Sequence, residues 1–423
     1  MAFQANLSSV SAMLKEVYPG EIEDEFNNEC ALWALLDSEK VQLAEGQHLV
    51  RPFRVGRNQG IGSRNDGDSL PASGRQSLQR AQINMSSTYL VGSITGRVIR
   101  SSYDDQAAFE NALSEEIKFD LTDMATEVCF QLYGLQGQRT TVNGNVVAST
   151  SVVVNSTQYL APNMYVEFWN GASNQTVNDA GLTNGQTGTL ITAVNNTTNT
   201  VTVTTAQTIT SGAGVSRAGN NTAQVTTKEA VGLDFMLDDG TDYSSIANYF
   251  GVSRVTYPIL YGNRFNAAGT TTENLMQRAF DAARQIGGGI IDVITTDYAS
   301  RRVYSNLLTS NKRYPVEGIN APEFAGGIKV SKDLRTQLGE GLSFSGAMVL
   351  PSRLAPPAKM FGLDTKSFHL YQQSDIEWIM NGDSVLHPLL AANNTDAYEF
   401  SLFYDFQVYD EKPNSGFKIV NTF

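Results

Sequence analysis

The chain has 423 residues, a length typical of two or three domains. Its 41% hydrophobic and 9% aromatic residues suffice for real cores and exclude global disorder. Charged residues make up only 17%, which indicates that other copies of the chain cover much of its surface, and the net charge of -13 argues against wrapping nucleic acid in positive charge.

Charge is distributed in blocks along the chain. Residues 1–45 carry nine acids and two lysines, a net of -7, whereas residues 46–100 carry eight arginines, two aspartates and no lysine, a net of +6. Residues 104–134 return to -7, with eight acids and one lysine, and residues 140–226 hold only three charged side chains. Blocks of this kind indicate separate architectural units.

The arginine-rich block 46–100 is predicted to form a long hairpin. Residues 46–55 alternate as a strand, a tip dense in Gly, Ser, Asn and Asp follows, and residues 81–99 return as apolar and β-branched strand. Because few apolar residues lie near the tip, the hairpin cannot bury itself, and we expect it to lie on a neighbour.

The acidic block 104–134 is the clearest helix. Asp104 and Asp105 suit its start, and Gly134 suits its end. At this length the helix would span about 46 Å, and its apolar stripe is too short and irregular for a coiled coil, which favours a backbone onto which a sheet is laid. The stripe consists of Phe109, Leu113, Ile117, Leu121, Met124, Val128 and Gln131/Leu132.

The block 140–226 is rich in Thr, Asn, Val and Gly and is predicted to form a small β-barrel or sandwich. Residues 188–194 and 200–210 alternate with period two around a polar turn, which is the pattern of a hairpin. Another strand lies within residues 159–171. Its expected core residues are Tyr165, Phe168 and Trp169.

The remainder mixes helices and strands. Further strands are predicted over 231–239 and 247–259, and an amphipathic helix over 271–286 ends at three glycines. A buried strand over 290–296 and a helix over 298–308 follow. The C-terminal third returns to strands over 341–350, 366–372, 398–410 and 417–423. The fold class is therefore α+β, with one long helix, a hairpin and an all-β insertion.

Motifs that carry chemistry are scarce. The sequence has no phosphate-binding loop, nucleophile elbow or zinc-protease motif, and the glycines at 60, 62 and 67 favour a flexible tip over a nucleotide-binding turn. Asp104–Asp105 and Asp238–Asp239 are expected to be cap and turn residues rather than cation ligands. A Ser-His-Asp triad assembles only in space and stays open as an alternative. We expect no catalytic residue, no metal and no cofactor.

Cysteine and histidine are too few for a framework of their own. Cys30 and Cys129 exclude a zinc ribbon by count, and both lie in apolar helical patterns that predict buried thiols. His48, His369 and His387 share no metal-ligand spacing. No secretory signal or membrane span is apparent, so we expect a soluble product made in a reducing cytoplasm.

Several strings resemble one branch of phage capsid sequences. They are LKEVYPG, VGRNQGIGSRNDGDSLPASGRQ, YLVGSITGRVIRSSYDDQAAFENALSEEI, RRVYSNLLTSNKRY and KMFGLDTKSFHLYQQ. With the order of elements, they make the chain similar to a tailed-bacteriophage major capsid protein of the Hong Kong-97-type fold. The resemblance covers nearly the whole chain except 140–226, which looks like an insertion domain, and none of the strings is a catalytic signature.

The resemblance implies a division of the chain into the parts of that fold. These are an N-terminal arm (1–45), an extended loop hairpin (46–100), a spine helix of the peripheral domain (101–139), a β insertion domain (140–226), peripheral domain strands (227–270), an axial domain (271–365) and return strands of the axial and peripheral domains (366–423).

In that family the extended loop lies across the neighbouring subunit, near its spine helix and peripheral domain. Because the loop is positive and the helix negative, we expect arginine–carboxylate contacts between copies, each worth under about 1 kcal/mol but setting register when repeated. The alternative for any single arginine is a solvated charge without a partner. The expected set is Arg51, Arg54, Arg57, Arg64, Arg75 and Arg80 against Glu110, Glu115, Glu116, Asp120 and Asp123.

Two departures from the family pattern concern how the shell is held together. Some members crosslink through a lysine in the extended loop and a distant asparagine, and residues 46–100 contain no lysine. About 45 residues precede the loop, which is too few for a fused scaffolding domain, so we expect a separate scaffolding protein and little proteolytic maturation. The insertion could project outward, stabilise the subunit during folding or contact neighbours.

These features together predict a structural major capsid protein, not an enzyme. It would self-assemble as hexamers and pentamers into an icosahedral head shell that encloses the double-stranded DNA of a tailed phage without sequence-specific binding. We expect it in the virion after assembly in the host cytoplasm, with no membrane and with scaffolding, portal and decoration proteins as partners. The alternative is a modular binding or adhesion protein that uses the Thr/Asn-rich β domain, and an enzyme comes third.

Overall fold

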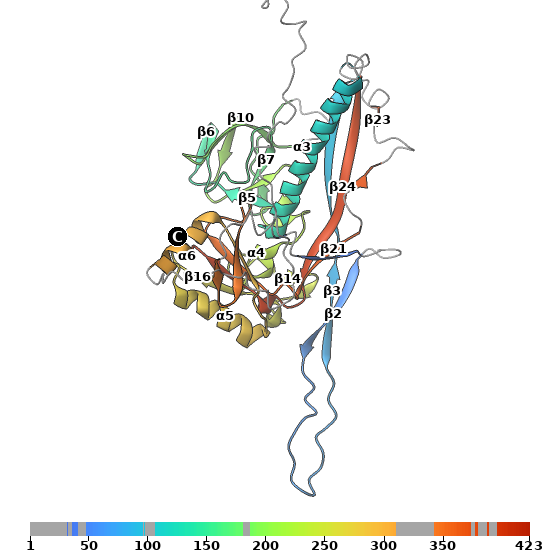
Figure 1. Cartoon of the computed structure of the whole chain (residues 1–423), viewed down its shortest axis with the longest axis vertical. Coiled ribbons are helices and arrows are strands. Elements are labelled where there is room, and N and C mark those ends of the chain that lie inside the picture. Colours follow the sequence, from blue (N-terminus) through green and yellow to red (C-terminus); the bar gives the residue numbers. More distant parts are fainter. Residues whose placement is uncertain are drawn as a thin grey trace, which may run out of the picture.

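The structure is a computed structural model of an elongated molecule with a hairpin projecting from one end of the body (Figure 1). It describes residues 32, 36–40, 48–95, 97, 106–180, 187–309, 342–373, 377–379, 387–388 and 396–423. The predicted N-cap residues Asp104 and Asp105, and most of the N-terminal arm, lie outside this range.

The long helix is confirmed as α3 (Gln106–Tyr133), which ends one residue before Gly134 as predicted. Its 28 residues span about 42 Å. Met124, Val128 and Leu132 of the predicted apolar stripe are buried, whereas Gln131 packs among them as a polar exception that hydrogen-bonds Thr88. For residues 106–118 and 121 the backbone alone is described, so the N-terminal part of the stripe is not tested.

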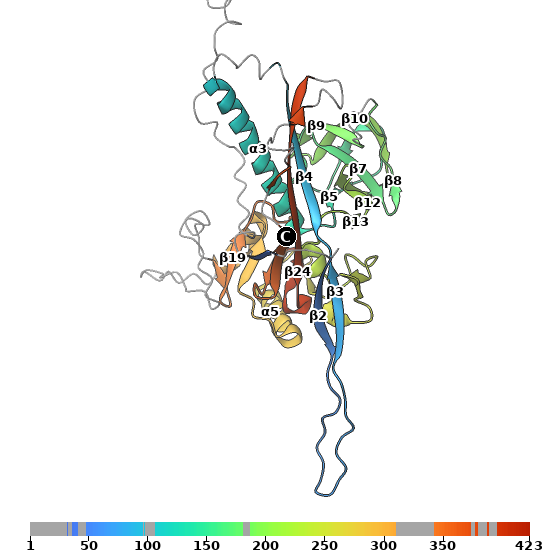
Figure 2. The same ribbon diagram turned by 90° about the vertical axis from the view of Figure 1, so that its right-hand side faces the viewer.

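A long sheet lies beside α3, as Figures 1 and 2 show. Its axis is the antiparallel pair of β4 and β24, which runs in register from Ser86↔Phe406 to Thr95↔Ala397. Gly92 faces the helix, because a Cβ atom at this position would lie 2.8 Å from Asp120 Oδ2 of α3. The same Cβ atom would lie 2.2 Å from the Phe400 ring of β24, so the site has room only for glycine. The strands are β1 (Asp37–Lys40), β4 (Ser86–Thr95), β21 (Phe368–Gln372), β22 (Glu377–Trp378), β23 (His387–Pro388) and β24 (Ala397–Asp410).

The predicted hairpin is present but shorter than expected. β2 (Leu49–Gly56) pairs with β3 (Ser77–Ile83), and residues 57–76 form the projecting tip. The return segment 81–99 was expected to stay in the hairpin, but only its start does. After Ile83 the chain enters β4 and pairs with β24 instead. The alternating pattern predicts a strand correctly but does not identify its partner.

The segment after α3 forms a separate sheet with its own apolar core. The hairpin predicted around residues 195–199 is confirmed as β9 and β10. Of the three aromatic residues expected in the core, only Phe168 is fully buried; Val166 joins it, and Tyr165 and Trp169 point to the other face because strand side chains alternate. The strands are β5 (Gln138–Thr141), β6 (Val146–Val153), β7 (Tyr165–Asn170), β8 (Ser173–Asn174), β9 (Thr189–Asn195), β10 (Thr200–Ile209) and β11 (Gly214–Arg217), followed by the pair β12 (Asn221–Ala223) and β13 (Thr226–Thr227).

A third sheet carries two helices and matches the predictions for the C-terminal half. The helix predicted over 271–286 is α5 (Glu273–Gly287), capped by the Thr272 hydroxyl and ended by Gly288 at φ 68°. The predicted buried strand is β17, and the next helix is α6 (Tyr298–Thr309). The strands are β16 (Asn263–Asn266), β17 (Val293–Thr296), β18 (Ser343–Phe344), β19 (Ala347–Pro351), β20 (Lys359–Leu363) and β25 (Phe417–Val420).

Of two strand predictions between the sheets, one is wrong and the other holds only in part. Residues 231–239 contain the short helix α4 (Leu233–Met236), all four residues of which are buried. Residues 247–259 form a small hairpin of β14 (Asn248–Tyr249) and β15 (Val252–Ser253), followed by the 3-10 helix η3 (Pro258–Leu260). Short apolar runs fit helix and strand equally well, and here tertiary packing decides.

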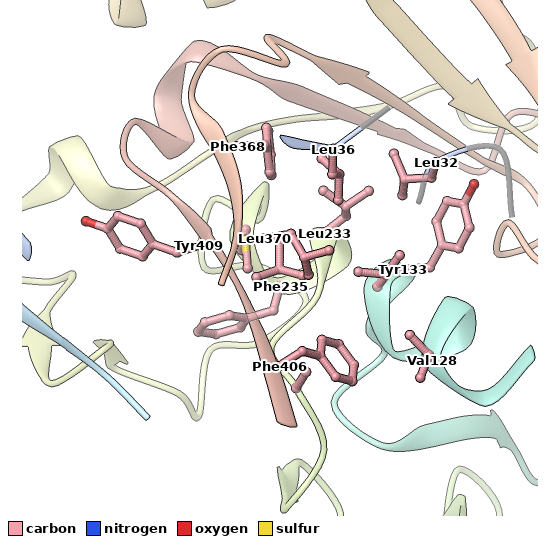
Figure 3. Close-up of a cluster of buried hydrophobic side chains, with 14 of the residues drawn as sticks. Leu32, Leu36, Val128, Tyr133, Leu233, Phe235, Phe368, Leu370, Phe406 and Tyr409 are labelled. Atoms are coloured by element: carbon pink, nitrogen blue, oxygen red, sulfur yellow. The ribbon is translucent and has the colours of Figure 1, made fainter. Parts of the chain in front are cut away.

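The largest core joins α3, α4, β21 and β24. Figure 3 shows residues of this cluster: Val128 of α3 lies beside Phe406 of β24, and Tyr133 of α3 lies beside Leu32. This core also buries Cys129, which is disulfide-bonded and so corrects the expected free thiol. The second cysteine of the sequence, Cys30, lies outside the described residues.

Candidate intersubunit surface

The root of the hairpin is fixed to the body. Ala81 and Ile83 of β3 are fully buried in the large core. Gln82 N donates to Phe250 O at 2.9 Å, and Gln79 Nε2 donates to the Tyr257 hydroxyl at 2.8 Å. The direction in which the hairpin leaves the body is therefore set by packing and hydrogen bonds.

The tip of the hairpin, in contrast, forms its hydrogen bonds within itself among the residues that the structure describes. Every residue from 61 to 70 is exposed, including Ile61 at 86% and Leu70 at 85%. Local bonds shape the turn: Arg64 Nε donates to Ser69 O at 2.9 Å, and Asp68 Oδ2 accepts from Asn65 N at 2.9 Å. Two exposed aliphatic side chains on a projecting tip suit burial against another molecule.

The six arginines predicted for contact lie along this hairpin. Arg51 is half-buried near the root, with its guanidinium carbon 5.2 Å from the centre of the Tyr371 ring, a cation–π distance. The sequence pattern gave no sign of that contact. The other five are exposed: Arg54, Arg57, Arg64, Arg75 and Arg80.

The predicted acidic partners lie on α3. Asp120 is half-buried and Asp123 is exposed, while the side chains of Glu110, Glu115 and Glu116 fall outside the described residues. Figure 1 places the N-terminal end of α3 and the hairpin tip at opposite ends of the molecule. One subunit therefore does not bring its own tip arginines to these acids.

A second exposed surface lies on the face of the long sheet that turns away from α3. Tyr89 and Val91 of β4 are 61% and 59% exposed. Tyr89 pairs across the sheet with the half-buried Phe403, and Val91 pairs with Ser401, whose carbonyl accepts from Ile379 N at 2.9 Å. The sequence interpretation did not identify this surface, although β4 has apolar residues on both of its faces, which is the signal of a strand covered twice.

These surfaces suit binding rather than catalysis. In the part of the chain that the structure describes, no group of three or more His, Cys, Asp or Glu side chains is placed to hold a metal ion. None of the described helices is long and apolar enough to cross a membrane.

Comparison with known proteins bears on the fold. No family model matches the chain, and no curated protein matches it. Among solved structures, the capsid asymmetric unit of cyanophage A-1(L) aligns with 99% of this chain and 100% of its own, at 13% identity and a TM-score of 0.59. The chain has the fold of phage capsid proteins. The capsid of a native GTA particle aligns over 99% of both chains, at 10% identity and a TM-score of 0.50.

The capsid fold confirms the overall resemblance drawn from the sequence strings. The alignment with the cyanophage subunit spans 99% of this chain. The arginine–carboxylate contacts between copies are not tested by a single chain and stay a prediction.

Proposed function

We propose that the chain is a major capsid protein that self-assembles into the icosahedral head shell of a tailed phage, around double-stranded DNA. The observation that carries this proposal is the exposed, arginine-bearing hairpin with a firmly packed root, on a chain with a capsid fold. A rigidly anchored projection with apolar residues at its tip gains free energy only by lying on another molecule. Subunits of a shell provide such a neighbour at every position.

The parts of the chain take their proposed roles from the Hong Kong-97-type fold. We assign the hairpin to the extended loop, α3 to the spine helix, the large core to the peripheral domain and the third sheet to the axial domain. The sheet of β5–β11 is assigned to an inserted domain. Copies would form hexamers and pentamers, with separate scaffolding and portal proteins, possible decoration proteins and assembly in the host cytoplasm before the virion is complete.

Charge supports contact between a hairpin and the α3 helix of another copy. The hairpin block carries a net charge of +6 and the helix block -7. Because the hairpin tip and the N-terminal end of α3 lie at opposite ends of one subunit (Figure 1), attraction between them acts between subunits. Exposed pairs add little stability individually, at about 0–1 kcal/mol, but many identical pairs reject wrong neighbours.

The experiment that tests the proposal combines electron microscopy and sedimentation of the chain expressed with its scaffolding protein. Closed shells or capsomer rings are expected. The variant Arg64→Glu/Arg75→Glu should stay folded but fail to assemble, whereas Arg278→Glu/Lys366→Glu, an equal charge change on exposed residues away from the hairpin, should assemble.

A charge swap tests the pairing itself. Adding Glu115→Lys/Glu116→Lys to the hairpin variant should restore shells if hairpin and helix meet between copies. Shells from the hairpin variant alone would reject the pairing, and a folded monomer under all conditions, with scaffold present, would reject the capsid function.

A further inference from the structure

A groove of about 330 Å³ lies where the hairpin root meets the body. One side is β2, from Arg51 to Arg54. The other side is formed by η3 and the last turn of α5, and residues 409–414 close it between them. It is built from fixed elements, because a Cβ atom on Gly287 of α5 would lie 2.3 Å from Asn414 O.

The lining of the groove combines apolar and cationic side chains. Ile259 and Ile286 are 45% and 63% exposed within it. Arg54 and Lys412 form no ion pair with any residue that the structure describes. Arg51 brings a third positive charge, and Glu411, 3.6 Å from His369 Nε2, is the one carboxylate in the lining.

This chemistry fits an acidic peptide with apolar side chains, and the chain itself contains one. Residues 16–29 hold six acids and no basic residue. Ile22 and Phe26 are four positions apart, so they share one side of the segment whether it is a helix or a strand. The hairpin tip of a second copy is a poor alternative, because its own arginines would repel those of the groove.

The segment is also attached near the groove. Asp37 of β1 pairs with His369, which pairs with Tyr409 of the groove lining, so Asp37 lies two strands or about 10 Å from Tyr409. Leu32, the first described residue, is buried in the large core, on the side of Leu36 away from Tyr409 (Figure 3). The six residues from Leu32 back to Phe26 reach up to about 20 Å when extended.

We propose that the acidic segment 16–29 binds the groove of its own chain, with its carboxylates on Arg54 and Lys412 and its apolar side chains on Ile259 and Ile286. Bound there, it would brace the root of the hairpin. The proposal does not depend on the function of the assembled protein.

The test is proteolysis of the full-length, unassembled chain with a glutamate-specific protease, following the cut after Glu21 by mass spectrometry. We expect slow cutting of the wild type and about tenfold faster cutting of Arg54→Glu/Lys412→Glu, the loss expected from two exposed ion pairs. The variant Arg64→Glu/Arg75→Glu has the same charge change outside the groove, and the protease should cut it after Glu21 at the wild-type rate.

A swap separates binding from misfolding. Adding Glu23→Lys/Glu25→Lys to the groove variant should restore protection at Glu21. Equal cutting of the wild type and the groove variant would overturn the proposal. Protection that appears only as protein concentration rises would also overturn it, because the occupant would then be a second copy.

Discussion

Lys418 Nζ lies 2.8 Å from Asp238 Oδ1, and both side chains are completely buried. Lys418 belongs to β25 of the third sheet, whereas Asp238 follows α4 of the large core, so the pair joins two cores. Asp242 Oδ2 lies 2.8 Å from the same ammonium, and Asp234 O accepts from it at 2.9 Å. Burial alone would lower the pKa of Lys418, but Asp234, Asp238 and Asp242 raise it above its ordinary value, so the lysine stays charged.

Replacing Lys418 by methionine should destabilise the chain by about 3–5 kcal/mol, because the buried carboxylates lose their shared cation. Urea unfolding of the unassembled chain measures the change. Lys366→Met removes an exposed lysine outside this cluster and should cost less than about 0.5 kcal/mol. The double variant Lys418→Met/Asp238→Asn should recover part of the loss, and a single variant as stable as the wild type would show that the pair does not hold the two cores together.

Asp410, at the end of β24, is expected to make stability fall as pH rises. Complete burial raises its pKa to about 7, and nearby Asp364 and Glu411 act in the same direction. The folded state therefore keeps a proton that the unfolded state releases near pH 4. Stability from this group is full below pH 4, declines between pH 4 and 7 and is constant above, with a total of up to about 4 kcal/mol.

Asp410→Asn should remove this decline. Unfolding free energies measured at pH 4.5, 6 and 7.5 check it, with Asp66→Asn, which removes an exposed carboxyl on the hairpin tip, as a control that should keep the wild-type slope. Asp410 Oδ1 accepts a hydrogen bond from Lys412 N at 2.8 Å, and the backbone oxygen of Asp410 accepts one from the Tyr249 hydroxyl at 2.8 Å. These bonds hold residue 410 in a fixed position. The same slope in Asp410→Asn and in the wild type would mean that this carboxyl does not retain its proton at neutral pH.

Elements determined by local signals were predictable from the sequence. Helix α5 has both its caps in the sequence: the Thr272 hydroxyl accepts from Leu275 N at 3.2 Å, and Gly288 adopts the left-handed conformation that ends it. Elements determined by distant partners were not. α4 is helical where a strand was expected. All four of its residues are buried in the core, and Asp238, just after it, forms an ion pair with Lys418, which is 180 residues further along the chain.

The candidate intersubunit surface was likewise predictable from the sequence only in part. The charge blocks predict that the hairpin arginines meet acids of another copy, and five of the six arginines are exposed in the single chain. They do not predict that Arg51 lies over Tyr371, nor that β4 leaves the hairpin, because both depend on strands about 300 residues away. The apolar pair Tyr89 and Phe403 is visible only once the register of β4 and β24 is known.

Asp179 is expected to hold the neighbouring strands β9 and β10 of the β5–β11 sheet together. Its Oδ2 accepts from Leu190 N at 2.8 Å and from Thr204 Oγ1 at 2.8 Å, and its Oδ1 accepts from the hydroxyls of Thr189 and Thr205. Burial would raise its pKa, but these bonds lower it below the ordinary value. Its stabilising effect is therefore present above about pH 4 and is lost as pH falls further.

Asp179→Ala should cost about 1–3 kcal/mol, because the donors lose their shared acceptor. Hydrogen exchange of β9 and β10 measures the effect locally, and the third sheet should exchange as in the wild type. Thr198→Ala, in the exposed turn between those strands, is the matched control and should change little. Unaltered protection of β9 in Asp179→Ala would assign its stability to strand pairing alone.

Arg139 of β5 is the side chain that should fix the β5–β11 sheet to the long helix. Its guanidinium pairs with Glu127 of α3, lies 3.5 Å from Glu229 Oε1 and stacks 3.7 Å from the centre of the Phe130 ring. Burial raises the pKa of Glu229 above its usual value, and Arg139 opposes that effect. Arg139 is therefore the buried cation that the two carboxylates share, and the more exposed Arg217 lies 3.8 Å from Glu127 Oε2.

Arg139→Met should loosen this joint at a cost of about 3–5 kcal/mol, because both carboxylates would lose the buried cation that they share and Glu127 would keep only the distant Arg217. Exchange protection should fall in β5 and in the last turns of α3, while β9 and β10 keep theirs because their core lies within the sheet. The triple variant Arg139→Met/Glu127→Gln/Glu229→Gln removes the stranded charges and should regain much of the stability. If the triple variant is no more stable than Arg139→Met, the joint is held by the contact between Phe130 and Tyr159, whose ring centres lie 4.8 Å apart, and not by the charges.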